Sequence, residues 1–100
     1  MSTLKRFFIA YDLITPGQKY AAVEDAIAKS CTWYMKLQYS LYFVISRHTA
    51  AEMYSRVRAV QDGNDKLAVI EAANAVISTA GNSEKEVFLN LWGTPDSEAA

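Results

Sequence analysis

The segment Leu4–Leu13 constrains the fold most strongly, because it is apolar on both faces of an extended chain. Strand alternation places Phe7, Ile9, Tyr11 and Leu13 on one face, and Phe8, Ala10 and Asp12 on the other. The turn sequence Thr15-Pro16-Gly17 ends the segment. A strand of this kind belongs in the centre of a sheet, with helices on one face and another surface, such as a partner subunit, on the other.

A helix and two strands are predicted next. Between Gln18 and Ser30, apolar residues recur at spacings of three and four, which predicts an amphipathic helix. Thr32–Gln38 and Ser40–Ser46 are dense in aromatic and β-branched residues and lack a helical period, so two strands are expected. The break between them is short enough for an antiparallel hairpin.

A second helix and a fourth strand complete the predicted core. Thr49 and Glu52 have the spacing of a capping box, which begins a helix that the turn residues 62–65 end. Lys66–Ala72 then alternates, with Leu67 and Val69 on one side and Ala68 and Ile70 on the other. The resulting order βαββαβ predicts an α+β, ferredoxin-like fold.

The C-terminal part adds an extension to this core. Residues 74–80 either extend the fourth strand or form a fifth. Asn82-Ser83 with Glu86 is a second capping-box pattern, and an apolar stripe from Val87 to Trp92 is closed by Gly93 and Pro95, which predicts a short helix. We therefore expect one domain over residues 1–100, with a core at about 4–72, an extension at 73–93 and a frayed tail at 94–100.

Composition limits the class of protein. Hydrophobic residues make up 51% and charged residues 21% of the 100 positions, which excludes intrinsic disorder. The net charge of −1 is far from that of a strongly basic nucleic-acid binder, so any phosphate-binding surface must be local. The single cysteine, Cys31, excludes a disulfide-stapled scaffold, and the apolar runs are too short to span a bilayer. A cytoplasmic protein with no membrane association is expected.

The second face of the predicted sheet needs a cover, because several strands place apolar residues on it. The C-terminal helix supplies that cover within the chain, or a second copy supplies it through a two-fold interface. We expect a homodimer, since two-fold pairing is the commonest symmetry of small proteins.

Asp12 is the residue whose position is least explained by folding. A carboxylate at the end of an apolar strand is costly to desolvate unless a cation, an amide or water satisfies it. One interpretation is a ligand of Mg²⁺ or Mn²⁺, with two copies of Asp12 brought together by a two-fold axis. The other interpretation is that Asp12 fixes the turn that follows the strand.

Three short motifs lie within Lys5–Ala72: Tyr11-Asp12-Leu13, the segment from Gln38 through Ser40 to Tyr42, and Asp65-Lys66-Leu67-Ala68-Val69-Ile70. Together they resemble the CRISPR-associated protein 2 family, whose architecture the virulence-associated protein D ribonucleases share. The resemblance implies a ferredoxin-like fold, a symmetric dimer and a metal-dependent nuclease in which Asp12 is the metal-binding catalytic residue. It also implies that Ser40 lies close to that aspartate.

This chain departs from the family in its basic residues, because the arginines that usually follow the aspartate are absent. Arg47, Arg56 and Arg58 remain as candidates for nucleic-acid binding, although each is also an ordinary surface charge. Arg56 and Arg58 are two apart on a helix and do not share a face. His48 is the sole histidine, which excludes a multi-histidine metal site within one chain.

Aromatic residues offer a further binding surface. Trp33, Tyr34, Tyr39 and Tyr42 either form a stacking platform for bases or pack in the core or a dimer interface, and packing is the expected role. The leading hypothesis is thus a homodimeric, Mg²⁺-dependent endonuclease or nucleic-acid-binding scaffold. The alternative is a non-catalytic dimeric protein-interaction module.

Overall fold

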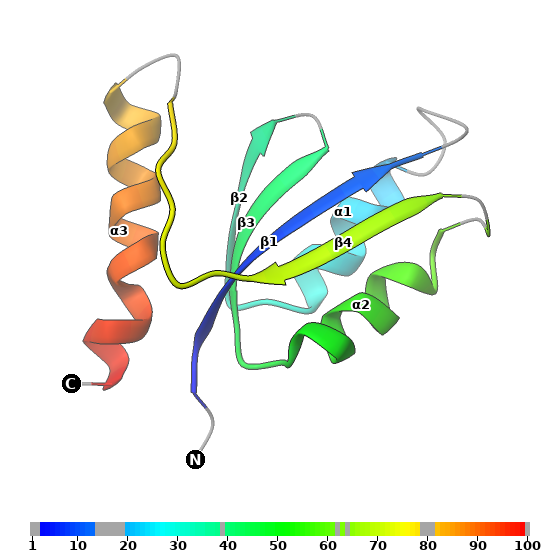
Figure 1. Cartoon of the computed structure of the whole chain (residues 1–100), viewed down its shortest axis with the longest axis horizontal. Coiled ribbons are helices and arrows are strands. Elements are labelled where there is room, and N and C mark those ends of the chain that lie inside the picture. The colour runs from blue at the N-terminus through cyan, green and yellow to red at the C-terminus, as the bar shows by residue number, and fades with distance from the viewer. Residues whose placement is uncertain are drawn as a thin grey trace.

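The computed structural model describes residues 3–13, 20–38, 40–61, 63, 65–78 and 82–99, which form an α+β fold of four strands and three helices. In chain order these elements are β1 (Lys5–Asp12), α1 (Tyr20–Lys29), β2 (Trp33–Gln38), β3 (Leu41–Ser46), α2 (Ala50–Arg58), β4 (Lys66–Glu71) and α3 (Asn82–Ala99). The strands form one antiparallel sheet in the order β2-β3-β1-β4 (Figure 1). This arrangement is compatible with a ferredoxin-like fold.

β1 is a central strand, as its two apolar faces predict. It pairs with β3 on one side and with β4 on the other, so that Phe8 lies opposite both Phe43 and Ile70. The predicted hairpin between β2 and β3 is also confirmed, with an irregularity between Lys36 and Gln38. The sheet is therefore built around the most apolar strand of the chain.

One face of the sheet packs against α1 and α2. Both helices direct an apolar stripe at the sheet, and the buried members are Val23 and Ile27 of α1 and Met53 and Val57 of α2. They meet Phe7, Ile9 and Tyr11 of β1 together with Tyr42 and Val44 of β3. We call this the helix face of the sheet. Burying these side chains is the main source of the fold's stability.

The other face is covered at one end by α3. Phe88 of α3 is buried with Leu4, Phe43 and Ile45, and Trp92 packs beside them. Arg6 links β1 to the same helix: its Nε donates to the Trp92 carbonyl oxygen at 2.8 Å and its Nη2 lies 2.7 Å from Asp96 Oδ2. The guanidinium also lies 4.7 Å from the centre of the Trp92 ring, a cation–π contact. Figure 1 shows α3 on the opposite side of the molecule from α1 and α2.

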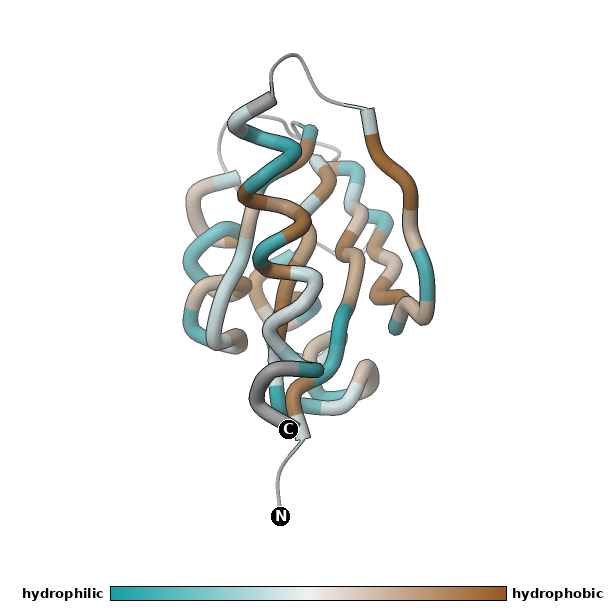
Figure 2. Tube along the Cα trace, turned by 90° about the vertical axis from the view of Figure 1, so that its left-hand side faces the viewer, coloured by the Kyte–Doolittle hydropathy of each residue, from teal (hydrophilic) through white to brown (hydrophobic). Residues whose placement is uncertain are grey.

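The rest of this second face is open, and we call it the open face. It consists of Phe8, Ala10, Leu41, Ala68 and Ile70, of which Ala68 and Ile70 are exposed. A cleft of about 610 Å³ separates it from the segment 75–78, whose apolar residues are brown in Figure 2. The C-terminal helix α3 thus covers only a part of this face.

The C-terminal region differs from the sequence-based prediction. α3 does not end at Gly93 but continues through Pro95 to Ala99, so the tail expected to fray at 94–100 is helical as far as Ala99. The expected capping box is also wrong, because α3 already includes Ser83. Pro95 lacks the N–H that would bond to the fourth residue before it. The contacts of Arg6 with Trp92 and Asp96 hold the helix on both sides of that break.

The segment after β4 was ambiguous in the sequence. Residues 74–78 form neither an extension of β4 nor a fifth strand, and residues 79 and 80 lie outside the described residues. Instead, Ala75 and Ile77 pack into the same apolar cluster as Phe88 and Leu91. Contacts with α3 thus replace strand pairing in this segment.

The capping box of α2 is formed as predicted. Thr49 Oγ1 accepts from the Glu52 N–H at 3.1 Å, and Glu52 Oε1 accepts from the Thr49 N–H at 2.8 Å. These bonds from Thr49 hold the pKa of Glu52 below its usual value. The carboxylate therefore contributes to helix stability at neutral pH, and the contribution fades as the pH falls through the lowered pKa.

We expect Thr49→Ala to lower the free energy of unfolding by about 1 kcal/mol, because the substitution leaves one N–H of the first helical turn without its acceptor. Urea denaturation at pH 7 measures this loss. Thr3→Ala is the control, since Thr3 is exposed and lies outside the helices and strands. Equal stability of the two variants would show that the cap contributes nothing.

Candidate functional site

Asp12 is the last residue of β1 and is exposed, on the same side of the sheet as Ala10 and Phe8. Its partner across the β1–β4 pair is Lys66, the first residue of β4. Within the described ranges, neither side chain has a hydrogen bond or ion pair. The alternative role, fixing the turn after β1, falls on residues 14–19, which lie outside the described residues. Asp12 thus presents a carboxylate to solvent at the edge of the open face.

Ser40 lies in the same corner of the sheet, but its side chain is on the helix face. The Ser40 carbonyl oxygen accepts from the Tyr11 N–H at 3.1 Å, and the Ser40 hydroxyl lies 3.5 Å from the hydroxyl of Tyr20 in α1. Because Tyr11 is buried against the helices and Asp12 is on the reverse side, the sheet separates the Ser40 hydroxyl from the carboxylate. The backbone bond between Tyr11 and Ser40 brings Asp12 and Ser40 close in space, but their side chains point to opposite faces of the sheet.

A single chain supplies few metal ligands at this corner. Asp65 is buried and directly precedes Lys66, so alternation along the chain puts it on the helix face, opposite to Asp12. In the part of the chain that the structure describes, no three His, Cys, Asp or Glu side chains are grouped so that they could hold a metal ion. A hard cation at Asp12 would need further oxygen ligands from water, substrate or a second copy.

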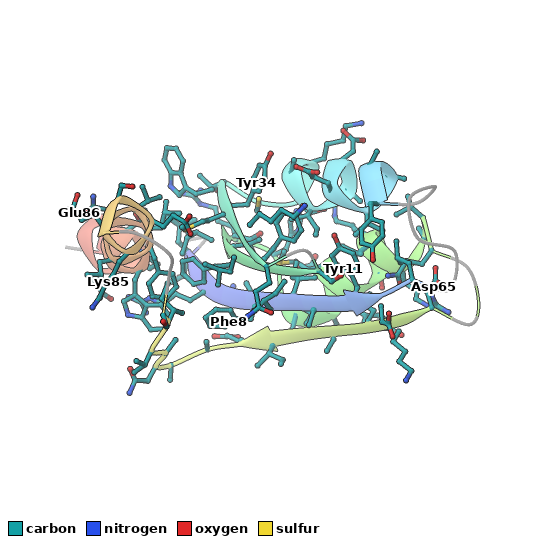
Figure 3. The ribbon with its side chains drawn as sticks, turned by 90° about the horizontal axis from the view of Figure 1, so that it is seen from above. Phe8, Tyr11, Tyr34, Asp65, Lys85 and Glu86 are labelled. Atoms are coloured by element: carbon teal, nitrogen blue, oxygen red, sulfur yellow. The ribbon has the colours of Figure 1, made fainter. Side chains whose placement is uncertain are left out.

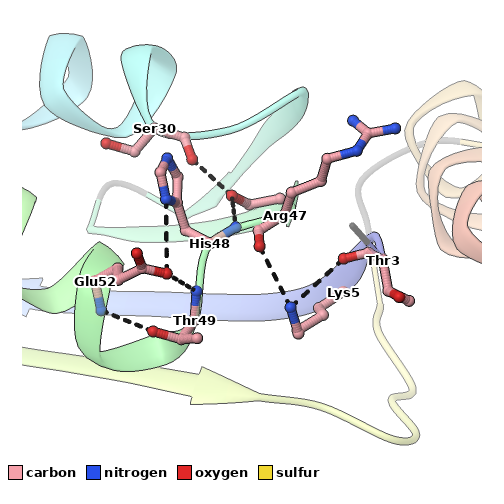
Figure 4. A network of polar contacts seen from close by, with 8 residues as sticks. Thr3, Lys5, Ser30, Arg47, His48, Thr49 and Glu52 are labelled. Atoms are coloured by element: carbon pink, nitrogen blue, oxygen red, sulfur yellow. Dashed lines mark hydrogen bonds and ion pairs between the residues drawn. The ribbon is translucent and has the colours of Figure 1, made fainter. Parts of the chain in front are cut away.

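Arg47 lies at the far end of the sheet from Asp12. It follows Ser46, which pairs with Lys5 at the start of β1, and β1 is eight residues long. At the rise of a strand, its two ends are about 23 Å apart. Arg47 Nη1 donates to Thr32 Oγ1 at 3.4 Å. The Arg47 carbonyl oxygen accepts from Lys5 Nζ at 3.3 Å (Figure 4).

His48 belongs to this same distant network. Its backbone N–H donates to Ser46 Oγ at 3.1 Å, and its Nδ1 is 3.8 Å from Glu52 Oε1. These contacts join β3 to the cap of α2. The geometry gives His48 a structural position beside the helix cap, remote from Asp12.

The two arginines of α2 do not form a cluster either. Arg58 is at the end of the helix and donates to the Gln61 side-chain oxygen at 3.2 Å and to the Gly63 carbonyl at 2.8 Å, so it holds the loop that leads into β4. Arg56 is exposed and lies near Glu52. The three predicted phosphate contacts are thus spread over two ends of the molecule.

Cys31 follows α1 and is partly buried against the helix-face core. Burial raises the pKa of its thiol to about 11. The thiol therefore stays protonated at neutral pH and is a poor nucleophile.

The aromatic residues do not form one stacking platform. Trp33 and Tyr34 are both about half exposed, but they are adjacent in β2 and project to opposite sides of the sheet. Tyr42 is fully buried, and burial, with Tyr11 and Glu24 nearby, raises the pKa of its hydroxyl. Tyr39 lies outside the described residues. Packing is the observed role of Tyr42.

A shallow depression of about 290 Å³ lies beside Asp12, at the corner where β1 meets β4. Ala10, Tyr11, Asp12, Lys66, Leu67 and Ala68 line it. Reasoning from the sequence missed Lys66 as a site residue. Strand alternation already put Lys66 on the side of Ala68, but its position opposite Asp12 depends on the β1–β4 register, which the sequence does not reveal.

Comparison with known proteins adds no relative: no protein-family model matches this chain, and no curated protein matches it. Among the described residues, no helix has both the length and the apolar character needed to cross a membrane. Any function must therefore be argued from the site itself.

Proposed function

We propose that the chain is a ferredoxin-like protein that pairs through its open face into a two-fold dimer and acts as a Mg²⁺-dependent endonuclease. The order of elements and the antiparallel order β2-β3-β1-β4 support the fold assignment. The observation that carries the function is Asp12: an exposed carboxylate, with no polar partner among the described residues, at the edge of an uncovered apolar face.

The open face supports pairing with a second copy. Ile70 is 54% exposed, and the neighbouring Phe8 and Leu41 continue the apolar surface across three strands. The segment 75–78 and α3 add exposed apolar residues, with Val76 95% and Leu89 56% exposed. A two-fold axis over this face buries both surfaces at once, because an isologous interface uses the same patch on each copy.

The same axis brings together carboxylates that the described residues of one chain do not group into a metal site. Asp12 continues the row of Phe8 and Ala10 on β1, so pairing near that row brings the two carboxylates toward each other. Mg²⁺ favours one or two carboxylates completed by water and phosphate oxygens, and Asp12 has the hard oxygen donors that it requires. When bound, Mg²⁺ polarises a phosphoryl oxygen and acidifies a coordinated water.

Within this proposal, the residues of the chain position and shape the site. Asp12 is fixed by its place in the β1–β4 ladder, and Ser40 and Tyr20 fix the end of β1 from the helix face. Ser40 thus acts through the backbone of Tyr11, as a positioning residue. Arg47 lies at the far end of the sheet, too far from this corner to contact the scissile phosphate, and Arg58 holds the loop that leads into β4.

Solution mass and cleavage together test the proposal. We expect a particle of twice the 11.1 kDa chain mass that cuts labelled 20-nucleotide RNA or DNA in Mg²⁺ and not in EDTA. Ile70→Glu puts a charge in the open face without entering the depression beside Asp12, and we expect it to give a folded monomer without cleavage. Ala51→Glu is the matched control, because Ala51 is exposed on α2. A monomeric parent protein, or an active Ile70→Glu monomer, would contradict the proposal.

A second candidate is a non-catalytic dimer that binds protein. The observation that favours it is that Arg47 and Arg58 make contacts within the chain, which leaves a sparse basic surface. Gel shifts at increasing salt separate the two candidates. A nucleic-acid binder loses affinity as salt rises, whereas a protein-interaction module gives no shift at any salt.

A further inference from the structure

Lys66 is the cation that the β1–β4 register places beside Asp12. Directly opposed residues in an antiparallel pair have Cβ atoms about 5 Å apart, close enough for both side chains to contact one ligand. Both residues are exposed, and both line the depression of about 290 Å³ at this corner. Opposite charges at this spacing usually form an ion pair, yet none joins them among the described residues. Each charge is available to a ligand.

The side chains at the base of the depression, next to these two charges, are small. The next pair along the ladder on the same side is Ala10 and Ala68, which have the smallest side chains after glycine. Two alanines beside two long polar side chains leave room for a group the size of a phosphate. The depression is thus bounded by the carboxylate of Asp12 and the ammonium group of Lys66, with the two alanines at its base.

A phosphodiester needs such an ammonium group here. The negative charge of Asp12 repels a phosphate, and a bound cation only reduces that repulsion. The nearby Arg58 already donates to the Gly63 carbonyl oxygen, so Lys66 is the cation that faces the depression. Lysine binds phosphate as a flexible point charge, and its four-carbon stem lets Nζ reach over Ala10 and Ala68.

We infer that Lys66 binds the phosphate of the nucleic-acid backbone next to Asp12, so that Asp12 and Lys66 form the two charged sides of one substrate-binding corner. This inference rests on the proposed function and extends it by naming the residue that contacts the substrate. Lys66 contacts a phosphate oxygen, whereas Asp12 faces the metal.

Binding measured in EDTA tests the inference apart from cleavage. We expect Lys66→Met to weaken binding of labelled single-stranded 20-nucleotide RNA or DNA several-fold. We also expect the plot of log affinity against log salt concentration to become less steep in this variant, by about 0.7 for each phosphate that the variant no longer neutralises. Lys66→Arg keeps the charge and should keep the slope. Lys85→Met is the control, because Lys85 is exposed on α3 at the other end of the molecule from Asp65 (Figure 3).

The outcomes separate the inference from the proposed function. An unchanged salt slope in Lys66→Met, with cleavage by the parent protein still dependent on Asp12, would overturn the inference and leave the nuclease standing. A reduced slope in a protein that does not cleave would support the Lys66 contact and reject the nuclease. A parent protein that binds neither RNA nor DNA at any salt would overturn both.

Discussion

Asp12→Asn should reduce Mg²⁺-dependent cleavage about 100-fold or more while leaving the fold intact. The substitution keeps the shape of the side chain and removes the charge that holds the cation, and a loss of about 3 kcal/mol of transition-state stabilisation corresponds to a factor of roughly 100. Asp12 is exposed, so its replacement should change the free energy of unfolding by less than about 0.5 kcal/mol. Initial cleavage rates under single-turnover conditions measure the effect.

Glu71→Gln is the matched control for this prediction. Glu71 is an exposed carboxylate at the other end of the same strand pair, opposite Phe7. The Glu71→Gln substitution changes the net charge of the protein by the same amount as Asp12→Asn but lies outside the proposed site. Equal cleavage by Asp12→Asn and the parent protein would eliminate the catalytic role of Asp12. An equal loss in Glu71→Gln would show that net charge is the cause.

Phe43→Ala should be the most destabilising single substitution in the region that joins the sheet to α3. Phe43 is fully buried, and its ring centre lies 5.3 Å from that of Phe8, 4.9 Å from that of Phe88 and 5.6 Å from that of Trp92. Removing a buried phenyl ring costs about 3 to 5 kcal/mol, from the transfer free energy of the ring and the cavity left behind. Urea denaturation of the variant measures this cost.

Val76→Ala is the comparison, because Val76 is apolar but 95% exposed, and its loss should change stability by less than about 0.5 kcal/mol. A Phe43→Ala variant as stable as Val76→Ala would show that α3 does not pack on the sheet in solution. That result would also uncover more of the open face.

Much of the core could be predicted from the sequence because its signals are local. Alternation in β1 and β4 and the capping box of Thr49 and Glu52 depend on neighbouring residues, and the structure confirms each of them. The end of α3 could not be predicted in this way. Pro95 is a local signal that a helix stops, but Arg6, far away in the sequence, holds the helix on both sides of it.

The candidate site was predictable only in part, for a similar reason. Asp12 stands out in the sequence because it interrupts an apolar strand. Ser40 and Lys66 owe their roles to strand register: register places the Ser40 hydroxyl beside Tyr20 on the helix face and Lys66 opposite Asp12 on the other. A shift of one residue would exchange these positions, and no local pattern fixes it.

Manganese titration followed by electron paramagnetic resonance tests the central claim most directly, since Mn²⁺ accepts the same oxygen ligands as Mg²⁺ and its free ion is readily counted. Two copies of Asp12 sharing one cation predict one bound Mn²⁺ for every two chains, and loss of that binding in Asp12→Asn. One Mn²⁺ for each chain, or binding that Asp12→Asn leaves unchanged, would contradict a site shared across the two-fold axis.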